Sequence, residues 1–134
     1  MAALNIEDVE LKLVYNVPHK EMPLYFNGSD LLLSTSLCEG SPNVIKVAIA
    51  CNCPIVSTNV GDVRWLLDDV EGCFITTNDP RDVADKINKA LNFKSKTKGR
   101  DKLFRLGFDS EHIAKKIIKV YEELIYSTLR GNSL

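Results

Sequence analysis

Four segments of the chain carry the apolar patterns of β-strands. Residues 10–15 read E-L-K-L-V-Y, an alternation of polar and apolar side chains that predicts a half-buried strand, and Pro18 then closes it with a turn. Residues 30–35 form a short, almost continuous apolar run, and residues 54–58 and 73–76 are similar short segments. Runs of this kind are typical of parallel strands that are covered on both faces.

Helical patterns separate these predicted strands. Residues 20–28 are long enough for two helical turns, and a short helix is expected at residues 63–67. Residues 44–51 read V-I-K-V-A-I-A-C, which is apolar on nearly every side and predicts a buried helix. We expect Ser41 to be its N-cap and Pro42 its first residue.

Two further helices follow the last predicted strand. Asp79 and Pro80 predict a capped helix start, and a polar connector follows at residues 94–99. The longest helix is expected to start at Asp109 and Ser110, with a charged opposite face. The apolar faces of the two helices comprise Val83, Ile87, Ala90 and Leu91 in the first, and Ile113, Ile117, Val120, Tyr121, Leu124 and Ile125 in the second. Residues 130–134 are expected to be a frayed tail.

Strands that alternate with helices predict an α/β fold with a mostly parallel sheet of about four strands, flanked by helices. The sequence shows neither an internal repeat nor a dividing linker, so residues 1–134 are expected to form a single domain. The ligand site of such a sheet lies at the carboxyl ends of its strands. Those ends are residues 17–20, 36–43, 58–62 and 76–79.

The composition argues against several classes of partner. The 17 basic and 18 acidic residues give a formal net charge of -1, so no bulk field attracts nucleic acid or an anionic membrane. The apolar runs are shorter than the roughly 20 residues of a transmembrane helix, and residues 1–13 lack the apolar core of a signal peptide. A cytoplasmic protein without a transmembrane segment is therefore expected.

The cysteines do not have the spacing of a metal site. Cys51 and Cys53 form a C-x-C pair, but there is no C-x-x-C repeat and no histidine at zinc-site spacing. This spacing argues against a metal site, and no cofactor is expected either. Free cysteines usually behave as small apolar side chains, so the four are expected to be reduced and mostly buried.

The sharpest local pattern is E-G-S-P-N at residues 39–43, a glycine turn between a predicted buried strand and a buried helix. The exposed amides and the positive end of the helix dipole would favour a phosphate by about 0.3–1 kcal/mol, or ~2 kcal/mol when partly buried. Many α/β proteins start a helix this way for capping only. The spacing by itself leaves both interpretations open.

Residues 38–63 resemble the donor site of the retaining GT-B glycosyltransferases, which use nucleotide-sugar donors. The resemblance rests on E-G-S-P-N-V at residues 39–44, C-P-I-V at residues 53–56 and T-N-V-G-D at residues 58–62, together with Ala48, Ala50 and Cys51. It extends to roughly residues 11–126. It implies the later part of a Rossmann-like nucleotide-sugar-binding domain, the C-terminal domain of a GT-B enzyme.

The family implies a role for each matching position. The residue matching Glu39 contacts hydroxyls of the donor sugar, although a loop carboxylate that caps backbone amides is the alternative. Val17 and Pro18 match a loop that packs against the nucleotide base, although a plain role at the end of a strand is nearly as plausible for Val17. The backbone that meets the diphosphate in relatives corresponds to Gly40, Ser41, Pro42, Asn43 and Val44.

Val47 departs from the family pattern. Relatives have a second glutamate eight positions after the first, and it holds the ribose hydroxyls of the nucleotide. Valine cannot accept these hydrogen bonds. Because hydrogen bonds to a charged group contribute about 1.5–3 kcal/mol each, donor binding should be weaker by roughly one to two orders of magnitude or more.

The resemblance also implies that the chain is truncated at its N-terminus. Residues 10–15 would match the third strand of a six-stranded domain, whose earlier part supplies the basic residues that neutralise the diphosphate. Without the first two strands, residues 30–35 would leave an unpaired sheet edge. We therefore expect a homodimer or swapped oligomer, or direct pairing of residues 10–15 with residues 30–35.

Two functions from different classes remain. The first is the donor-binding part of a glycosyltransferase of glycan or polysaccharide biosynthesis, which is expected to be nearly inactive as this chain because it lacks the acceptor side. The second is a binding or oligomerisation module derived from the same fold, which Val47 supports. A related sugar-nucleotide epimerase is a third possibility that no residue favours.

Overall fold

The structure, a computed structural model, describes residues 9–131 of the chain. The chain divides into two compact units, one ending at Arg100 and one beginning at Asp101. The single domain predicted for residues 1–134 stays a prediction.

The first unit is an α/β layer structure around a parallel sheet. Its strands are β1 (Leu32–Ser34), β2 (Ile55–Thr58) and β3 (Cys73–Thr76), in the order β1-β2-β3. The register aligns Leu33 with Val56 and Val56 with Phe74, and both pairings are parallel. The predicted α/β class and parallel sheet are confirmed, but the described sheet has three strands rather than four.

Residues 10–15 are not a strand, so this prediction was wrong. They run as irregular chain, with Leu13 76% and Tyr15 78% exposed. A strand needs a neighbour for its backbone groups, and among the described residues β1 pairs with β2 only. The expected pairing of residues 10–15 with residues 30–35 is therefore absent, whereas the homodimer or swapped oligomer stays a prediction.

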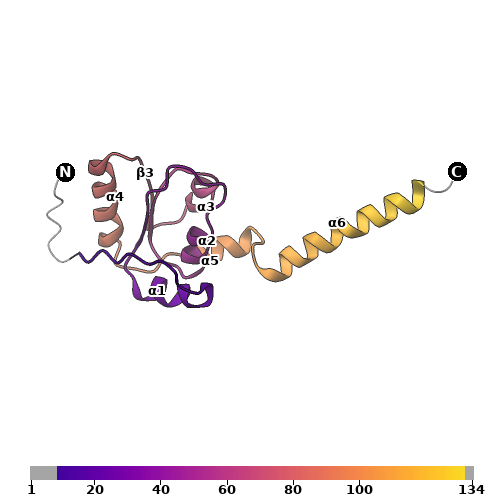
Figure 1. Ribbon diagram of the computed structural model, residues 1–134, viewed down its shortest axis with the longest axis horizontal. Helices are drawn as coiled ribbons and strands as arrows, with labels where there is room; N and C mark the ends of the chain where they lie inside the picture. The colour runs from indigo at the N-terminus through magenta and orange to yellow at the C-terminus, as the bar shows by residue number, and fades with distance from the viewer. Residues whose placement is uncertain (1–8, 132–134) are drawn as a thin grey trace. The chain divides into compact units, whose positions relative to one another are not determined.

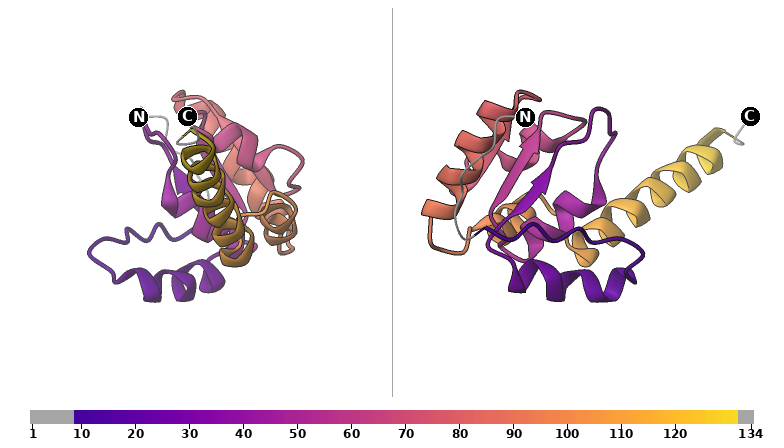
Figure 2. Two further views of the ribbon diagram at one scale, coloured as in Figure 1. Left: turned by 90° about the vertical axis from the view of Figure 1, so that its right-hand side faces the viewer. Right: turned by 60° about the vertical axis from the view of Figure 1, so that its left-hand side comes forward.

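Helices cover both faces of the sheet. Figure 1 and the right view of Figure 2 show α4 on one side of the strands and α2 on the other. The helices of this unit are η1 (His19–Glu21), α1 (Met22–Gly28), α2 (Asn43–Ala50), α3 (Val63–Leu67) and α4 (Pro80–Asn92). The core is made by fully buried side chains of α2, β2 and α3, namely Ile45, Ile49, Ile55, Val56, Val63 and Leu66. Burial of each such side chain contributes about 1.5–3 kcal/mol.

Helix α2 begins one residue later than predicted. Its N-cap is Pro42, in an extended conformation, and no side chain caps it. Ser41 is therefore not the N-cap, and Pro42 is not the first helical residue. The Ser41 hydroxyl instead donates to the carboxylate of Asp62, a partner 21 residues away that local sequence cannot reveal. After α2, Asn52 adopts the left-handed conformation with φ 54°, which asparagine tolerates well.

The second unit is helical. Helix α5 (Gly99–Arg105) spans the boundary of the two units, and α6 (Ser110–Gly131) follows in the second. The sequence predicted α6, whereas the short, mostly charged α5 was missed. Because α6 continues to Gly131, residues 130 and 131 are helical, and the rest of the predicted frayed tail, residues 132–134, lies outside the described residues.

The backbone of the loop after β2 lies directly against the backbone of the loop after β1. Gly61 has φ +51°, and a Cβ built on it would lie 2.0 Å from Gly40 O and 2.7 Å from Glu39 O. Gly40 is not in the left-handed region, and a Cβ there would have no atom within 4 Å. The glycine that this junction requires is therefore Gly61, not the Gly40 of the predicted glycine turn.

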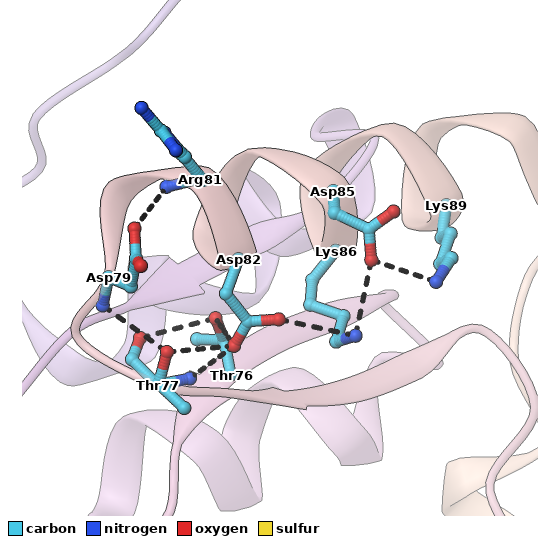
Figure 3. Close-up of polar contacts among 8 residues, drawn as sticks. All are labelled: Thr76, Thr77, Asp79, Arg81, Asp82, Asp85, Lys86 and Lys89. Atoms are coloured by element: carbon cyan, nitrogen blue, oxygen red, sulfur yellow. Dashed lines mark hydrogen bonds and ion pairs between the residues drawn. The ribbon is translucent and has the colours of Figure 1, made fainter. Parts of the chain in front are cut away.

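The turn from β3 into α4 is closed by one carboxylate (Figure 3). Asp82 Oδ2 accepts hydrogen bonds from Thr77 N at 2.7 Å, Thr77 Oγ1 at 2.9 Å and Thr76 Oγ1 at 3.1 Å. These bonds, the one from the Thr77 amide first, lower the pKa of Asp82 to about 2. Asp79 caps the helix as predicted, because its Oδ1 accepts from Arg81 N at 2.8 Å.

Replacing Gly61 should destabilise the first unit. We expect Gly61→Ala to lower the free energy of unfolding by roughly 2 kcal/mol or more, because alanine resists positive φ and its Cβ would overlap the Gly40 carbonyl. Gly40→Ala is the matched control and should cost less than about 1 kcal/mol, since its added Cβ meets open space. Urea unfolding followed by circular dichroism measures both. Equal losses would contradict the asymmetry.

The Asp82 bonds should make stability fall in acid. Because the folded-state pKa of about 2 lies below the ordinary 3.8, the stabilisation is complete above about pH 4 and is lost as the pH falls through 2. Asp82→Asn should lower the melting temperature at pH 7, and the gap to wild type should close by pH 2. Asp85→Asn is the control, because the Asp85 carboxylate bonds to the Lys86 and Lys89 side chains within residues 9–131, and its smaller effect should vanish with added salt. A difference in melting temperature between Asp82→Asn and wild type that stays constant from pH 7 to pH 2 would contradict the stabilising role of the Asp82 carboxylate.

Candidate functional site

Three loops leave the carboxyl edge of the sheet. Strand β1 leads into residues 35–42, β2 into residues 59–62 and β3 into residues 77–79. The strands are parallel, so all three loops start at the same edge, where ligands of open α/β sheets bind. Thr58 Oγ1 donates a 2.6 Å hydrogen bond to Ser36 O and so joins the first two loops.

A chain of polar side chains crosses the junction of these two loops. Lys46 Nζ donates to Ser41 Oγ at 2.5 Å, and the Ser41 hydroxyl donates to Asp62 Oδ2. The other carboxylate oxygen of Asp62, Oδ1, is buried and has no hydrogen-bond partner. The arrangement therefore holds a cation and a hydroxyl at the start of α2 and leaves one buried acceptor unsatisfied, which lowers stability unless a donor reaches it.

Glu39 lies in the loop after β1 with its side chain exposed. One carboxylate oxygen, Oε1, accepts a 3.2 Å hydrogen bond from Ser36 Oγ. This is the single hydrogen bond found for the Glu39 carboxylate among the described residues. The group therefore keeps acceptor capacity for a ligand, because an ionised carboxylate accepts several hydrogen bonds.

The start of α2 presents backbone donors beside this loop. Pro42 is buried, and the exposed Asn43 is the first residue of the helix, followed by the partly exposed Val44. The first N–H groups of a helix have no partner within it and favour an anion. Val47 lies one turn further along α2, half-buried, with a side chain that neither donates nor accepts a hydrogen bond.

Val17 is placed at the entrance to η1. It is half-buried and precedes Pro18, whose carbonyl accepts a 2.8 Å hydrogen bond from Glu21 N. The hydrogen bonds found in residues 9–131 do not join Val17 to residues 36–43. The structure thus groups Glu39 to Val44 on one loop and helix start, and the role of Val17 at a nucleotide base stays a prediction.

Three residues of this junction were missed as site residues, namely Lys46, Gly61 and Asp62. A signal existed for two of them, because residues 58–62 follow β2 as residues 36–43 follow β1, and the ends of neighbouring parallel strands meet. Lys46 gave a weaker signal, since a lysine in the first turns of a helix is usually solvated. Lys46 contacts Ser41, which lies before the extended Pro42 and outside the helix.

Metal ligands do not mark this site within the described residues. Residues 9–131 contain no group of three or more side chains suited to hold a metal ion, and no helix among them is long and apolar enough to cross a membrane. A hollow of about 510 Å³ lies beside residues 67–75, at the amino end of β3, and one of about 350 Å³ lies beside α1. Neither hollow is lined by Ser41, Lys46 or Asp62.

No disulfide joins the four cysteines. Cys51 and Cys53 are buried as predicted, and burial raises the pKa of the Cys53 thiol to about 11, so it stays protonated at neutral pH. Cys73 is half-buried. Cys38 is exposed in the loop before Glu39, which corrects the expectation that the cysteines are mostly buried.

Two curated relatives are glycosyltransferases by name. An uncharacterised glycosyltransferase of Methanocaldococcus jannaschii is 31% identical over 108 residues, which is 78% of this chain and 31% of that protein. The GPI3 subunit of phosphatidylinositol N-acetylglucosaminyltransferase from Saccharomyces cerevisiae is 25% identical over 119 residues, 85% of this chain and 26% of that protein. The chain thus spans about a third or less of the length of these relatives. No solved structure gives a significant match.

The sequence comparison also finds a family. Residues 2–92, which include the whole sheet and the polar junction at its carboxyl edge, match the family described as Glycosyl transferases group 1. This match agrees with the parallel α/β architecture and with the two relatives. The chain belongs to the group 1 glycosyltransferases.

Proposed function

We propose that this chain is the donor-binding part of a glycosyltransferase that transfers a sugar from a nucleotide-sugar to an acceptor. The observation that carries the proposal is the junction of the loops after β1 and β2 at the start of α2, where Ser41, Lys46 and Asp62 meet. Family membership supports sugar transfer as the reaction class. The activity of the whole relatives is not carried over, since the chain spans only part of them.

The diphosphate of the donor is assigned to the start of α2. Backbone N–H groups of residues 43–44 and the dipole of the helix favour a negative group by about 0.3–1 kcal/mol, or ~2 kcal/mol when partly buried. The Lys46 ammonium, held beside Ser41, adds positive charge at the same end of the helix. The loop backbone of Gly40 and Ser41 completes this surface.

Glu39 is assigned to the hydroxyls of the donor sugar. Its carboxylate is exposed and keeps acceptor capacity beyond the single bond from Ser36. A purely structural loop carboxylate would be expected to accept several backbone N–H bonds. The only hydrogen bond found for its carboxylate in residues 9–131 comes from the Ser36 side chain, and this favours the ligand role.

Binding of the donor should nevertheless be weak. Val47 stands where relatives have the carboxylate that holds the ribose, and its side chain cannot replace those hydrogen bonds. Glu39, Ser41 and Asn43 are also exposed to water, whereas catalysis requires both substrates to be held together against water. We therefore propose that the chain by itself does not transfer sugar.

The alternative function is a binding or oligomerisation module that keeps the fold without the donor. Val47 is the observation that favours it, because a lineage that no longer binds a nucleotide has no need of the ribose carboxylate. The two functions differ in a measurable way. A donor site binds nucleotide sugars, however weakly, and a module of the second kind does not.

Calorimetry with UDP- and GDP-sugars tests the proposed function. We expect one of them to bind with a dissociation constant in the millimolar range. Glu39→Gln should lower the affinity for the nucleotide sugar more than the affinity for the free nucleoside diphosphate. Incubation with donor should release no sugar. Absence of binding to every donor tested would favour the module, and turnover by the chain alone would contradict the proposed inactivity.

Restoring the carboxylate should strengthen the site. We expect Val47→Glu to tighten donor binding about 10- to 100-fold, because two hydrogen bonds from the ribose to a charged group become available. Val47→Gln is the matched control of similar size without charge, and it should give a clearly smaller gain. Calorimetry with the same nucleotide measures both variants. Equal affinity of wild type and Val47→Glu would show that residue 47 does not face the ribose.

A further inference from the structure

Helix α6 carries a broad apolar face that is exposed to solvent. Ile117 is 52%, Val120 55% and Leu124 59% exposed. Together with Ile113 these residues are spaced by four, three and four positions, which is the spacing of a seam between two packed helices. A seam of this kind packs against a partner surface. The charged side chains beside the seam indicate which partner fits.

The charges beside the seam change sign along the helix. Lys116 precedes Ile117 in the first half of the seam, and Glu123 precedes Leu124 in its second half, so both lie on the same flank. Lys119 contacts Glu123 at 3.8 Å with the lysine first, the order that stabilises an isolated helix less. The flank that carries Lys116 and Glu123 is thus basic in the first half of the seam and acidic in the second half.

An antiparallel second copy of α6 would match both the seam and the charges. With a twofold axis near residue 119, Ile113 meets Leu124 and Ile117 meets Val120 of the other copy. The same alignment sets Lys116 opposite Glu123 of the other copy, and by symmetry this ion pair forms twice.

A parallel second copy does not produce this match. The flanking positions that face each other in a parallel pair would set Lys116 against Tyr121 of the other copy. Equal residues of the seam would meet, and the lysines of both copies would lie at the same level. Charge complementarity therefore selects the antiparallel arrangement.

We propose that α6 is a self-association surface through which two copies of this chain pair antiparallel, with Lys116 of each copy opposite Glu123 of the other. The surface lies wholly within the second unit. It is independent of the donor site and of the unpaired edge of β1. Self-association through α6 therefore does not depend on the proposed function.

Charge reversal in the full chain tests the pairing. Lys116→Glu sets two glutamates against each other at both symmetric positions, and Glu123→Lys does the same with two lysines. Each variant should weaken dimerisation by about tenfold or more in sedimentation velocity. An equimolar mixture of the two variants should form a heterodimer with nearly wild-type affinity, because both ion pairs are then restored with swapped signs.

Two further variants complete the test. Lys89→Glu in α4 changes the net charge equally without touching α6 and should dimerise like wild type, whereas Ile117→Lys should abolish the dimer. Circular dichroism checks that all variants keep their helix content. A monomeric wild type, a mixture that fails to restore the dimer, or an Ile117→Lys variant that still dimerises would overturn the proposal.

Discussion

The backbone of Gly61 lies against the carbonyl groups of Glu39 and Gly40, and the whole junction at the carboxyl edge of the sheet depends on this approach. It brings the loop after β2 close enough for Asp62 to accept a hydrogen bond from Ser41. It is possible because β1 and β2 are parallel neighbours, so their loops leave the same edge. A side chain at position 61 would separate the loops and with them the polar groups of the candidate site.

Much of the fold was predictable where the determinants are local. The apolar run of residues 54–58 predicts β2, and the Asp79-Pro80 start predicts α4 together with its cap. Residues 10–15 show the limit of this reasoning. Their alternation fits a strand, but a strand also needs a neighbour with free backbone groups, and a sequence pattern does not specify whether that neighbour exists. Helix α5 was missed because it is short and mostly charged and carries little apolar periodicity.

The candidate site was predictable in place but not in detail. The order of strand, loop and helix placed residues 39–44 at the carboxyl end of β1 and the start of α2, where the structure has them, and their role toward a ligand stays a prediction. The polar chain through Lys46 and Asp62 depends on a tertiary contact between two loops, so local cap rules assigned the Ser41 hydroxyl to the helix instead. Side chains that bridge distant segments are the part of a site that a single sequence conceals most.

Fold and donor affinity are determined by different faces of the same helix. Ile45, Ala48 and Ile49 of α2 are completely buried and hold the helix on the sheet. Val47 is half-buried beside them and contributes to this packing as an apolar side chain, whichever ligand group relatives carry there. Under the proposed function, exchange of a carboxylate for valine at this position would remove ribose recognition without opening the core, and it would relieve the cost of a partly buried charge. A chain can therefore keep the family fold and the loop junction while its affinity for the nucleotide falls. Membership of the family thus does not determine how strongly a chain binds the donor.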